Sequence, residues 1–230
     1  MRIILIVNKP PSNLQPAKMM HYTTAKFCEQ SHMSLVALWD LGNVVVQWNP
    51  TRIREMTGLP EAKTDVFNSR YFEDLWLELD RGTTDEREVA NKVAAETELS
   101  KVEVDLYFAA VRESLVDFTE SIDLIRQMKD QDIKMYVLSN MSLVNAKYLR
   151  QRAYFQLFDG IVISAEEKLI KPDTALFQLL LDRYQLDPTK MVFMDDSLPN
   201  ITAAESLGMH GVHFKATSEC YTKIKRYFKL

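Results

Sequence analysis

The chain has 230 residues, of which 47% are hydrophobic and 26% are charged, and its formal net charge at neutral pH is -4. This composition is typical of a globular protein that buries a sizeable core, and the mildly acidic balance excludes a basic surface for nucleic acid. The two cysteines, Cys28 and Cys220, lack zinc-ligand or redox-motif spacing, which excludes a disulfide framework and a zinc site and favours a reducing, cytoplasmic setting.

Residues 1–32 are predicted to be an N-terminal extension. It is either dispensable or the product of an upstream translation start that is rarely used. Its apolar stretch, Ile3 to Val7, is shorter than the core of a secretory signal, and turn-forming residues follow in PPSNLQP. No apolar run reaches the about 20 residues that span a bilayer. We therefore expect neither export nor a membrane span.

Five short apolar runs with strand character follow, separated by helical stretches. They cover Ser34 to Asp40, Lys134 to Asn140, Gly160 to Ser164, Lys190 to Asp195 and Gly211 to Lys215. Continuous apolar runs are typical of parallel strands that helices cover on both faces. Between them, helical periodicity is clearest around Phe177, and Ser197 is expected to cap a helix with Pro199 in its first turn. The alternation predicts a doubly wound α/β fold.

One interval interrupts this alternation. More than ninety residues, Leu41 to Ile133, separate the first strand from the second, too many for one crossover connection. From about Pro50 to Phe118 they are helical and charged, with a break at Gly82 and Thr83. The predicted division is an α/β core over residues 33–49 and 119–230, with an inserted helical subdomain over residues 50–118.

Polar residues follow the predicted strands at the edge where an open parallel sheet binds its ligands. They are Asp40 after the first strand, Ser139 and Asn140 after the second, Lys171 beyond the third, and Asp195 and Asp196 after the fourth. Converging carboxylates repel one another unless their pKa values rise or a cation is bound. Mg²⁺ is the expected cation because it takes oxygen ligands and accepts phosphate oxygens among them.

Four segments carry a more specific resemblance. In order, WDLGNVVVQWNP, VLSN, the KPD of LIKPD, and VFMDDSLPNITAA resemble the four motifs of the haloacid dehalogenase-like hydrolase superfamily. The DLGNV form followed by a small helical cap is most similar to the branch that contains bacterial α-glucose-1-phosphate phosphatases. The resemblance implies a Rossmann-like core with a five-stranded parallel sheet, helices on both faces, and a small all-helical cap inserted after the first strand.

The resemblance also implies a role for each motif residue. Asp40 would be the nucleophile that forms an aspartyl-phosphate. Ser139 and the main-chain N–H of Asn140 would bind the phosphoryl oxygens, and Lys171 would neutralise charge on the nucleophile and the phosphate. Mg²⁺ would be held by Asp40, Asp196 and the carbonyl oxygen of Gly42, with Asp195 and Asn200 in supporting or water-mediated positions.

Gly42 departs from the family pattern, since most phosphatases of the superfamily have an aspartate there as general acid and base. Such help is worth about 10² to 10⁴ in rate, so its loss favours activated esters such as sugar 1-phosphates, acyl phosphates or aryl phosphates. An acid of the predicted cap could replace it. The sequence offers five candidates and does not single one out: Glu73, Asp74, Glu78, Asp80 and Glu86.

These observations predict a Mg²⁺-dependent phosphatase acting on a small phosphorylated metabolite, with a sugar 1-phosphate as one candidate. The alternative is a catalytically weak or inactive relative that binds a phospho-ligand or a protein. Metal-free dehalogenation of 2-haloacids is a third reading, against which the Asp195–Asp196 pair argues. Neither nucleic acid nor membrane is expected as a partner, and the oligomeric state stays open.

Several other residues have a structural and a functional interpretation. Lys168 is a rival to Lys171 for the catalytic amine, although Pro172 favours Lys171. Packing is the expected role of Tyr71, Phe72, Trp48 and Trp76. His210 and His213 are expected to be structural, and the cluster Asp85 to Glu88 is expected to begin a solvated helix.

Overall fold

A computed structural model of the chain describes residues 35–230, and these contain a five-stranded parallel sheet. The predicted extension, residues 1–32, lies outside the described residues. The strands are β1 (Val36–Trp39), β2 (Met135–Ser139), β3 (Gly160–Ile163), β4 (Met191–Asp195) and β5 (His210–His213). Each lies where an apolar run predicts it, and the α/β fold class is confirmed. The last strand ends earlier than predicted because its partner β4 ends at Asp195, which pairs with His213.

The strand order is β3-β2-β1-β4-β5, with every pair parallel. β1 is therefore central, and its carboxyl end lies between those of β2 and β4. In an open parallel sheet the crevice for ligands forms where the strand order reverses, which here is beside β1. The topology thus brings residues that follow β1, β2 and β4 to one place.

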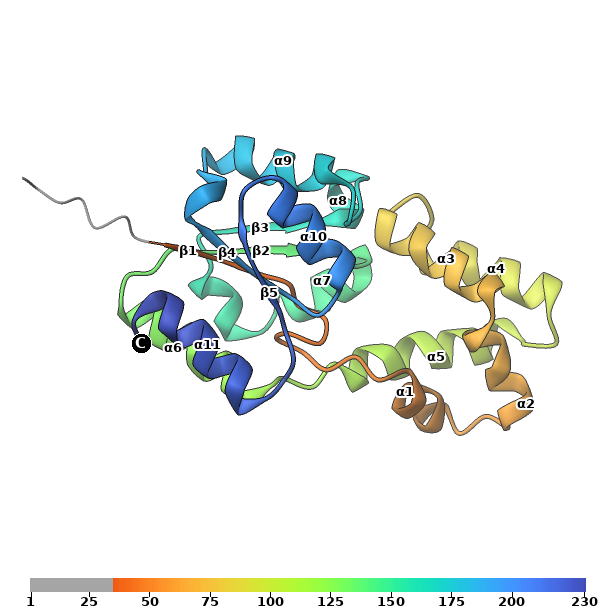
Figure 1. The fold of residues 1–230 in the computed structure, drawn as a ribbon. Coiled ribbons are helices and arrows are strands. Elements are labelled where there is room, and N and C mark those ends of the chain that lie inside the picture. The colour runs from red at the N-terminus through yellow and green to blue at the C-terminus, as the bar shows by residue number, and fades with distance from the viewer. Residues whose placement is uncertain (1–34) are drawn as a thin grey trace, which may run out of the picture. The chain divides into compact units, whose positions relative to one another are not determined.

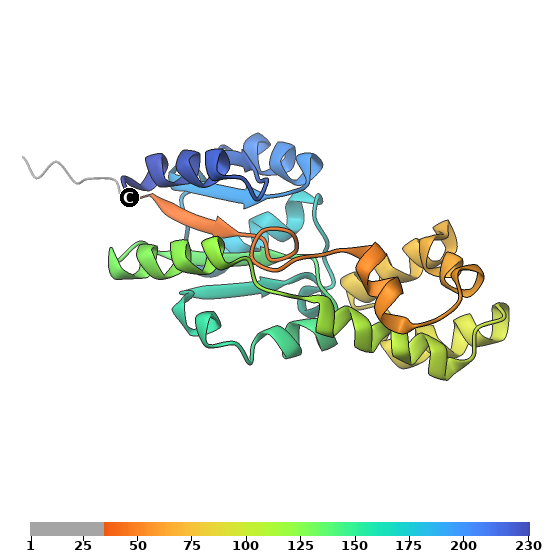
Figure 2. The same ribbon diagram turned by 90° about the horizontal axis from the view of Figure 1, so that it is seen from below.

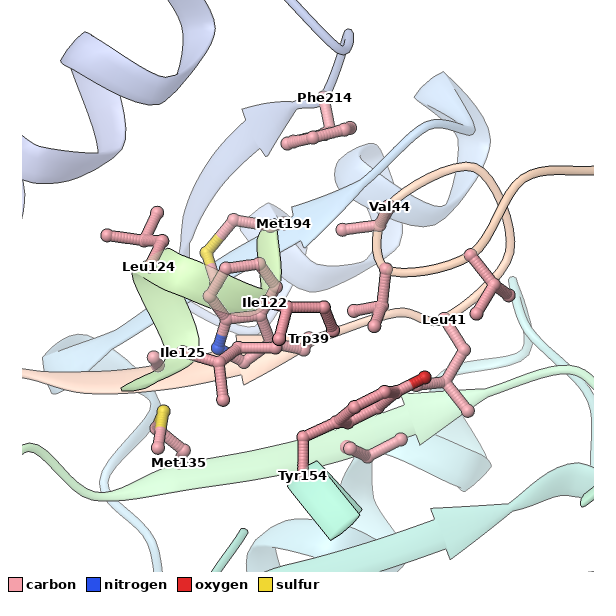
Figure 3. Close-up of a cluster of buried hydrophobic side chains, with 14 of the residues drawn as sticks. Trp39, Leu41, Val44, Ile122, Leu124, Ile125, Met135, Tyr154, Met194 and Phe214 are labelled. Atoms are coloured by element: carbon pink, nitrogen blue, oxygen red, sulfur yellow. The ribbon is translucent and has the colours of Figure 1, made fainter. Parts of the chain in front are cut away.

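The two faces of the sheet are buried under different helices. Alternate residues along a strand point to opposite faces, so Trp39 belongs to an apolar cluster with Ile125, whereas Leu38 belongs to another with Phe177. In Figure 3, Trp39, Met194 and Ile125 come from three separate elements and meet in one apolar cluster. The core helices are α6 (Thr119–Asp130), α7 (Leu143–Leu149), α8 (Ser164–Glu167), α9 (Thr174–Tyr184), α10 (Leu198–Ser206) and α11 (Ser218–Phe228).

Five helices between β1 and β2 form an insert with an apolar core of its own, which includes Phe72, Val104 and Phe108. They are α1 (Pro50–Thr57), α2 (Glu61–Thr64), α3 (Arg70–Arg81), α4 (Glu86–Glu96) and α5 (Lys101–Ser114), here called the helical insert. Figures 1 and 2 show the helical insert beyond the carboxyl ends of the strands.

Local signals explain where the insert helices begin and end. Side-chain caps start α3 at Ser69 and α4 at Asp85, the latter through a full capping box with Glu88. Gly58 and Gly82 end α1 and α3 in the left-handed conformation that glycine adopts most readily. In residues 35–230 no helix combines the length and apolar character that crossing a membrane requires.

Candidate active site

Lys171 is the centre of a buried charge cluster at the carboxyl ends of the strands. Its ammonium lies 2.9 Å from Oδ1 of Asp40 and 2.6 Å from Oδ2 of Asp195, and it donates to the main-chain oxygen of Leu138 at 2.9 Å. Burial opposes the charged form of Lys171, but the charges of Asp40 and Asp195 raise its pKa. The lysine therefore stays protonated and links residues at the carboxyl ends of three different strands, β1, β2 and β4.

Asp40 presents a carboxylate whose proton affinity is raised. Burial is the largest cause, and the charge of Asp195 acts in the same direction, while Lys171 lowers the pKa; the result is a pKa of about 6. At neutral pH most of the carboxyl group is ionised. The structure thus places an ionised, poorly solvated oxygen at the end of the central strand, as a nucleophile requires.

Asp195 is fully buried, and its oxygens are engaged by protein groups. Asn200 donates to both oxygens at 3.1 Å, and the main-chain N–H of Ser197 donates to Oδ1 at 2.8 Å. Ser197 is at the N-cap of α10 with Pro199 in the first turn, as predicted, but its side chain makes no capping hydrogen bond. Its backbone instead binds Asp195, which orients Lys171 from a position behind the cavity wall.

Asp196 is partly exposed and faces the same cavity as Asp40. The side-chain amide of Asn43 donates to its Oδ2 at 3.0 Å, and Asn43 in turn accepts from the backbone N–H of Trp48 at 2.9 Å. Asn43 adopts a φ of 53°, a left-handed conformation that asparagine tolerates better than most residues. The tight turn after β1 therefore aims Asn43 at the loop after β4.

Ser139 and Asn140 end β2 beside this cluster, as the motif predicts. The Ser139 hydroxyl is buried and makes no well-aligned hydrogen bond to any described protein group, although it lies close enough to Asp40 to lower the pKa of that carboxyl. The Asn140 side chain exchanges two hydrogen bonds with the backbone of Lys171, at 2.8 and 2.9 Å. Asn140 thus holds the lysine loop, while Ser139 has a free hydroxyl for a ligand.

A cavity of about 520 Å³ is lined by Asp40, Asn140, Lys171 and Asp196, whereas Ser139 and Asp195 lie outside its lining. Its walls combine polar residues of the core with the apolar side chains of Trp48, Trp76, Leu115 and Met141. The two tryptophan rings lie 5.1 Å apart, and Trp76 also packs on Phe108 of the insert core. The expectation of packing therefore holds, but Trp48 and Trp76 also line the cavity, unlike Tyr71 and Phe72.

The cavity also contains two residues from elements outside the four motifs. Asn145 of α7 is buried, and its Oδ1 has no hydrogen-bond partner in the described part of the chain. No pattern marks Asn145 in the sequence. Asp80, the penultimate residue of α3, comes from the helical insert. Burial first, and then the charge of Asp40, raise the pKa of Asp80 to about 7, against smaller opposing effects of the Ser142 backbone and Lys171.

Other sequence candidates lie outside the cavity. Lys168, the rival of Lys171, is exposed and donates to the main-chain oxygen of Gly82. His213 contacts the main-chain oxygen of Asp196 at 2.9 Å, and the ring of His210 lies 5.9 Å from that of Tyr227, so both have structural contacts. Of the cluster Asp85 to Glu88, Glu86 is not solvated as expected, because Arg112 binds it at 2.7 Å.

The donor set at the cluster suits a hard divalent cation. One oxygen from each of Asp40, Asp195 and Asp196 lies within 4.8 Å of the others. Lys171 neutralises one of these three carboxylates, which leaves excess negative charge in a partly desolvated site. Carboxylate oxygens with this residual charge fit Mg²⁺, and neither histidine nor cysteine is among the cavity-lining residues of the described part, 35–230.

The chain belongs to the haloacid dehalogenase-like hydrolase family, whose model matches residues 37–208, and it is a hydrolase. It is 28% identical over 178 residues to a sesquiterpene phosphatase, astK, of Aspergillus oryzae, covering 77% of this chain and 88% of the relative. It is 29% identical over 193 residues to a drimenol cyclase, drtB, of Aspergillus calidoustus, covering 82% of this chain but only 35% of that protein.

The fold is also that of solved members of the family. A family enzyme of Bacteroides thetaiotaomicron, solved in complex with magnesium and inorganic phosphate, superimposes with a TM-score of 0.66. The sequence identity is 23%, and the match covers 80% of this chain and 96% of that enzyme. The family membership and the parallel fold agree with the resemblance that the four motifs carry.

Proposed function

We propose that this hydrolase is a Mg²⁺-dependent phosphatase that acts through an aspartyl-phosphate on Asp40. The observation that carries the proposal is the placement of Asp40 at the cavity floor, paired with Lys171 and close to Asp196 and Ser139. The relative named as a phosphatase and the magnesium and phosphate bound by a structural neighbour support the same chemistry.

Each residue has a role that its position supports. An oxygen of Asp40 attacks phosphorus, the bond to the leaving oxygen breaks, and water later releases phosphate from Asp40. Lys171 offsets negative charge on the nucleophile and on the phosphoryl group, and the Ser139 hydroxyl donates to a phosphoryl oxygen. Mg²⁺, when bound by Asp40, Asp196 and the Gly42 carbonyl, supplies further charge neutralisation. Asp195 takes the supporting position, because protein donors engage both of its oxygens.

The helical insert is proposed to act as a cap, residues 50–118, that contributes the wall of the substrate cavity. Trp76 of α3 and Trp48, just before α1, make this wall largely apolar beside the polar floor. A sugar 1-phosphate satisfies the floor but buries less apolar surface against the tryptophan wall than a larger apolar alcohol does. A phosphate ester of an apolar alcohol, such as a terpenoid, fits both parts, and the terpenoid phosphatase among the relatives supports this substrate class.

A panel of phosphate esters tests the proposal. Purified protein is assayed for phosphate release from farnesyl phosphate, glucose 1-phosphate, acetyl phosphate and p-nitrophenyl phosphate, with Mg²⁺ and with a chelator. We expect Mg²⁺-dependent turnover that Asp40→Asn abolishes, with the highest kcat/KM for farnesyl phosphate. If no ester is hydrolysed and Asp40→Asn changes nothing, the chain is the non-catalytic relative that Gly42 leaves open. Higher kcat/KM for glucose 1-phosphate would favour the sugar substrate.

A further inference from the structure

Residue 42, at which most phosphatases of the superfamily have an aspartate, is a glycine in this chain. The structure nevertheless has space for a side chain there. A Cβ built on Gly42 meets no described atom within 4 Å, and the glycine does not adopt a left-handed conformation. Crowding therefore does not explain the glycine. A proton donor for the leaving oxygen, if the reaction uses one, has to come from another element at the cavity.

Asp80 is the carboxyl group of the helical insert that faces Asp40 across this cavity. Asp80, Asp40 and Gly42 all line it. Among the other candidate acids, Glu73, Asp74 and Glu78 are exposed and absent from the cavity lining. The remaining candidate, Glu86, is held by Arg112 through two hydrogen bonds at 2.7 and 2.9 Å.

The end of α3 is fixed to the core beside the reacting groups. The main-chain oxygen of Asp80 accepts from the Ser164 hydroxyl, which itself accepts from the N–H of Met141 at 2.9 Å. Met141 directly follows Asn140, the residue that holds the Lys171 loop. Ser164 therefore connects the backbone of Asp80 to the loop that follows β2. This connection restricts the position of the Asp80 side chain relative to the core.

Close packing continues two residues further along the chain. Gly82 approaches the core so closely that a Cβ there would lie 2.2 Å from the main-chain oxygen of Ala165. The exposed Lys168 donates to the oxygen of Gly82 from the core side. Contacts on both sides of residue 81 thus fix the backbone that carries the Asp80 side chain, and a catalytic group needs such pre-organisation.

We propose that Asp80, a residue of the helical insert, is the general acid and base that the core of this enzyme lacks at Gly42. This step rests on the proposed phosphatase function. As the bond from phosphorus to the leaving oxygen breaks, the proton of Asp80 moves to that oxygen and the alcohol departs. In the second half, the Asp80 carboxylate takes a proton from water while the water oxygen bonds to phosphorus and the bond to Asp40 breaks. Phosphate leaves, and Asp80 is protonated again.

The raised pKa of Asp80 agrees with this role, because a group with a pKa near the working pH is populated in both protonation states. The assignment also changes the expected substrate range. With Asp80 as proton donor, the enzyme can hydrolyse alkyl phosphates, which have poor leaving groups. Without any acid to replace the one missing at Gly42, it would favour activated esters.

The test compares Asp80→Asn with Asp74→Asn, which makes the same chemical change at an exposed site of the same helix. For each variant, kcat/KM is measured with acetyl, p-nitrophenyl, phenyl and alkyl phosphates at saturating Mg²⁺. This constant covers the reaction up to departure of the leaving group, so it isolates the acid step. We expect Asp80→Asn to lower kcat/KM by about 100-fold or more for alkyl phosphates and by less than about 10-fold for p-nitrophenyl phosphate.

A second measurement addresses the base step. With p-nitrophenyl phosphate, Asp80→Asn should release a burst of one p-nitrophenolate per active site, because water attack on the aspartyl-phosphate becomes slow. Adding Gly42→Asp to Asp80→Asn should restore turnover of alkyl phosphates, since the space at Gly42 is open. Thermal unfolding of each variant verifies that it is folded.

Two results would overturn the assignment of Asp80. The first is that the wild type hydrolyses esters and that Asp80→Asn has the same kcat/KM values as Asp74→Asn. The other is a loss of the same size for every leaving group. Both differ from failure of the phosphatase proposal itself, in which the wild type hydrolyses no ester and Asp40→Asn has no effect.

Discussion

The Nζ of Lys171 lies 2.6 Å from Oδ2 of Asp195, and both groups are buried. Removal of one partner from a buried ion pair leaves an uncompensated charge, which costs about 3 to 5 kcal/mol. Removal of the Lys171 ammonium leaves two carboxylates uncompensated, because Lys171 pairs with Asp40 as well as with Asp195. The pair is thus a structural element of the fold as well as part of the proposed active site.

We expect Lys171→Met to destabilise the metal-free protein by about 3 to 5 kcal/mol in urea unfolding. Lys190→Met is the control, because Lys190 forms an exposed pair with Asp187 and its removal should cost about 0.5 kcal/mol or less. Mg²⁺ should recover part of the loss in Lys171→Met, since a second cation then faces the carboxylates. Equal stability of the two variants would contradict this account.

Asp196→Asn should weaken Mg²⁺ binding by about 100-fold or more, because it removes a charged oxygen ligand. Asn43→Ala, which removes only the hydrogen bond to Asp196, should weaken binding by about 10-fold to 100-fold. Isothermal titration with Mg²⁺ in the absence of substrate measures both changes. Asp187→Asn is the control on an exposed carboxylate, and an affinity loss there of similar size would show a nonspecific charge effect.

Gly82→Ala should be more damaging than Gly58→Ala, although both glycines end a helix in the left-handed conformation. The φ values are 70° and 66°, so the backbone penalty of about 1 kcal/mol is common to both. Only the Cβ at residue 82 meets the backbone of Ala165. We expect Gly82→Ala to lose a further 1 to 3 kcal/mol, about the cost of overpacking, and to reduce turnover of alkyl phosphates. Urea unfolding and ester hydrolysis of the two variants, measured side by side, check this.

Asp80→Asn should stabilise the metal-free protein at pH 8 and leave its stability nearly unchanged at pH 4. Burial and the charge of Asp40 raise the pKa of Asp80 to about 7 in the folded protein, from its ordinary value of 3.8. Between these values the folded state binds more protons than the unfolded state, so the wild type loses stability as pH rises through this window. Asparagine has no such titration. Urea unfolding at the two pH values, with chelator present, tests the sign, and a gain of equal size at both would contradict it.

Trp76→Leu should raise KM for farnesyl phosphate by about 10-fold, because less apolar surface is buried around the substrate. KM for acetyl phosphate, whose acyl group is too small to reach the tryptophan wall, should change little. Leu77→Ala is the control on the same helix, since Leu77 is an exposed apolar residue. Steady-state kinetics with both esters checks this, and parallel changes for the two would tell against an apolar substrate.

The local pattern of residues was enough to predict the five strands, because continuous apolar runs bounded by turn residues are a short-range signal. The same signal places Asp40, Ser139 and Asp195 at strand ends, and the open sheet brings such ends to one edge. Spacing also identified the long interval after β1 that holds the helical insert. These features depend on residues within about ten positions of one another, as periodicity does.

Only the tertiary structure decided which acid of the insert reaches the cavity and which lysine lies beside Asp40. Helical periodicity indicates the buried face of α3 but not the point at which the helix meets the core, so Asp80 could not be separated from Glu78 or Asp74. That point depends on Gly82 packing against Ala165, residues 83 positions apart that no local pattern connects. Pro172 favours Lys171 over Lys168 in the sequence, but the fold decides the pairing with Asp40. Asn140, 31 positions before Lys171, binds its backbone, whereas Lys168 donates to the oxygen of Gly82, and no local pattern connects these residues.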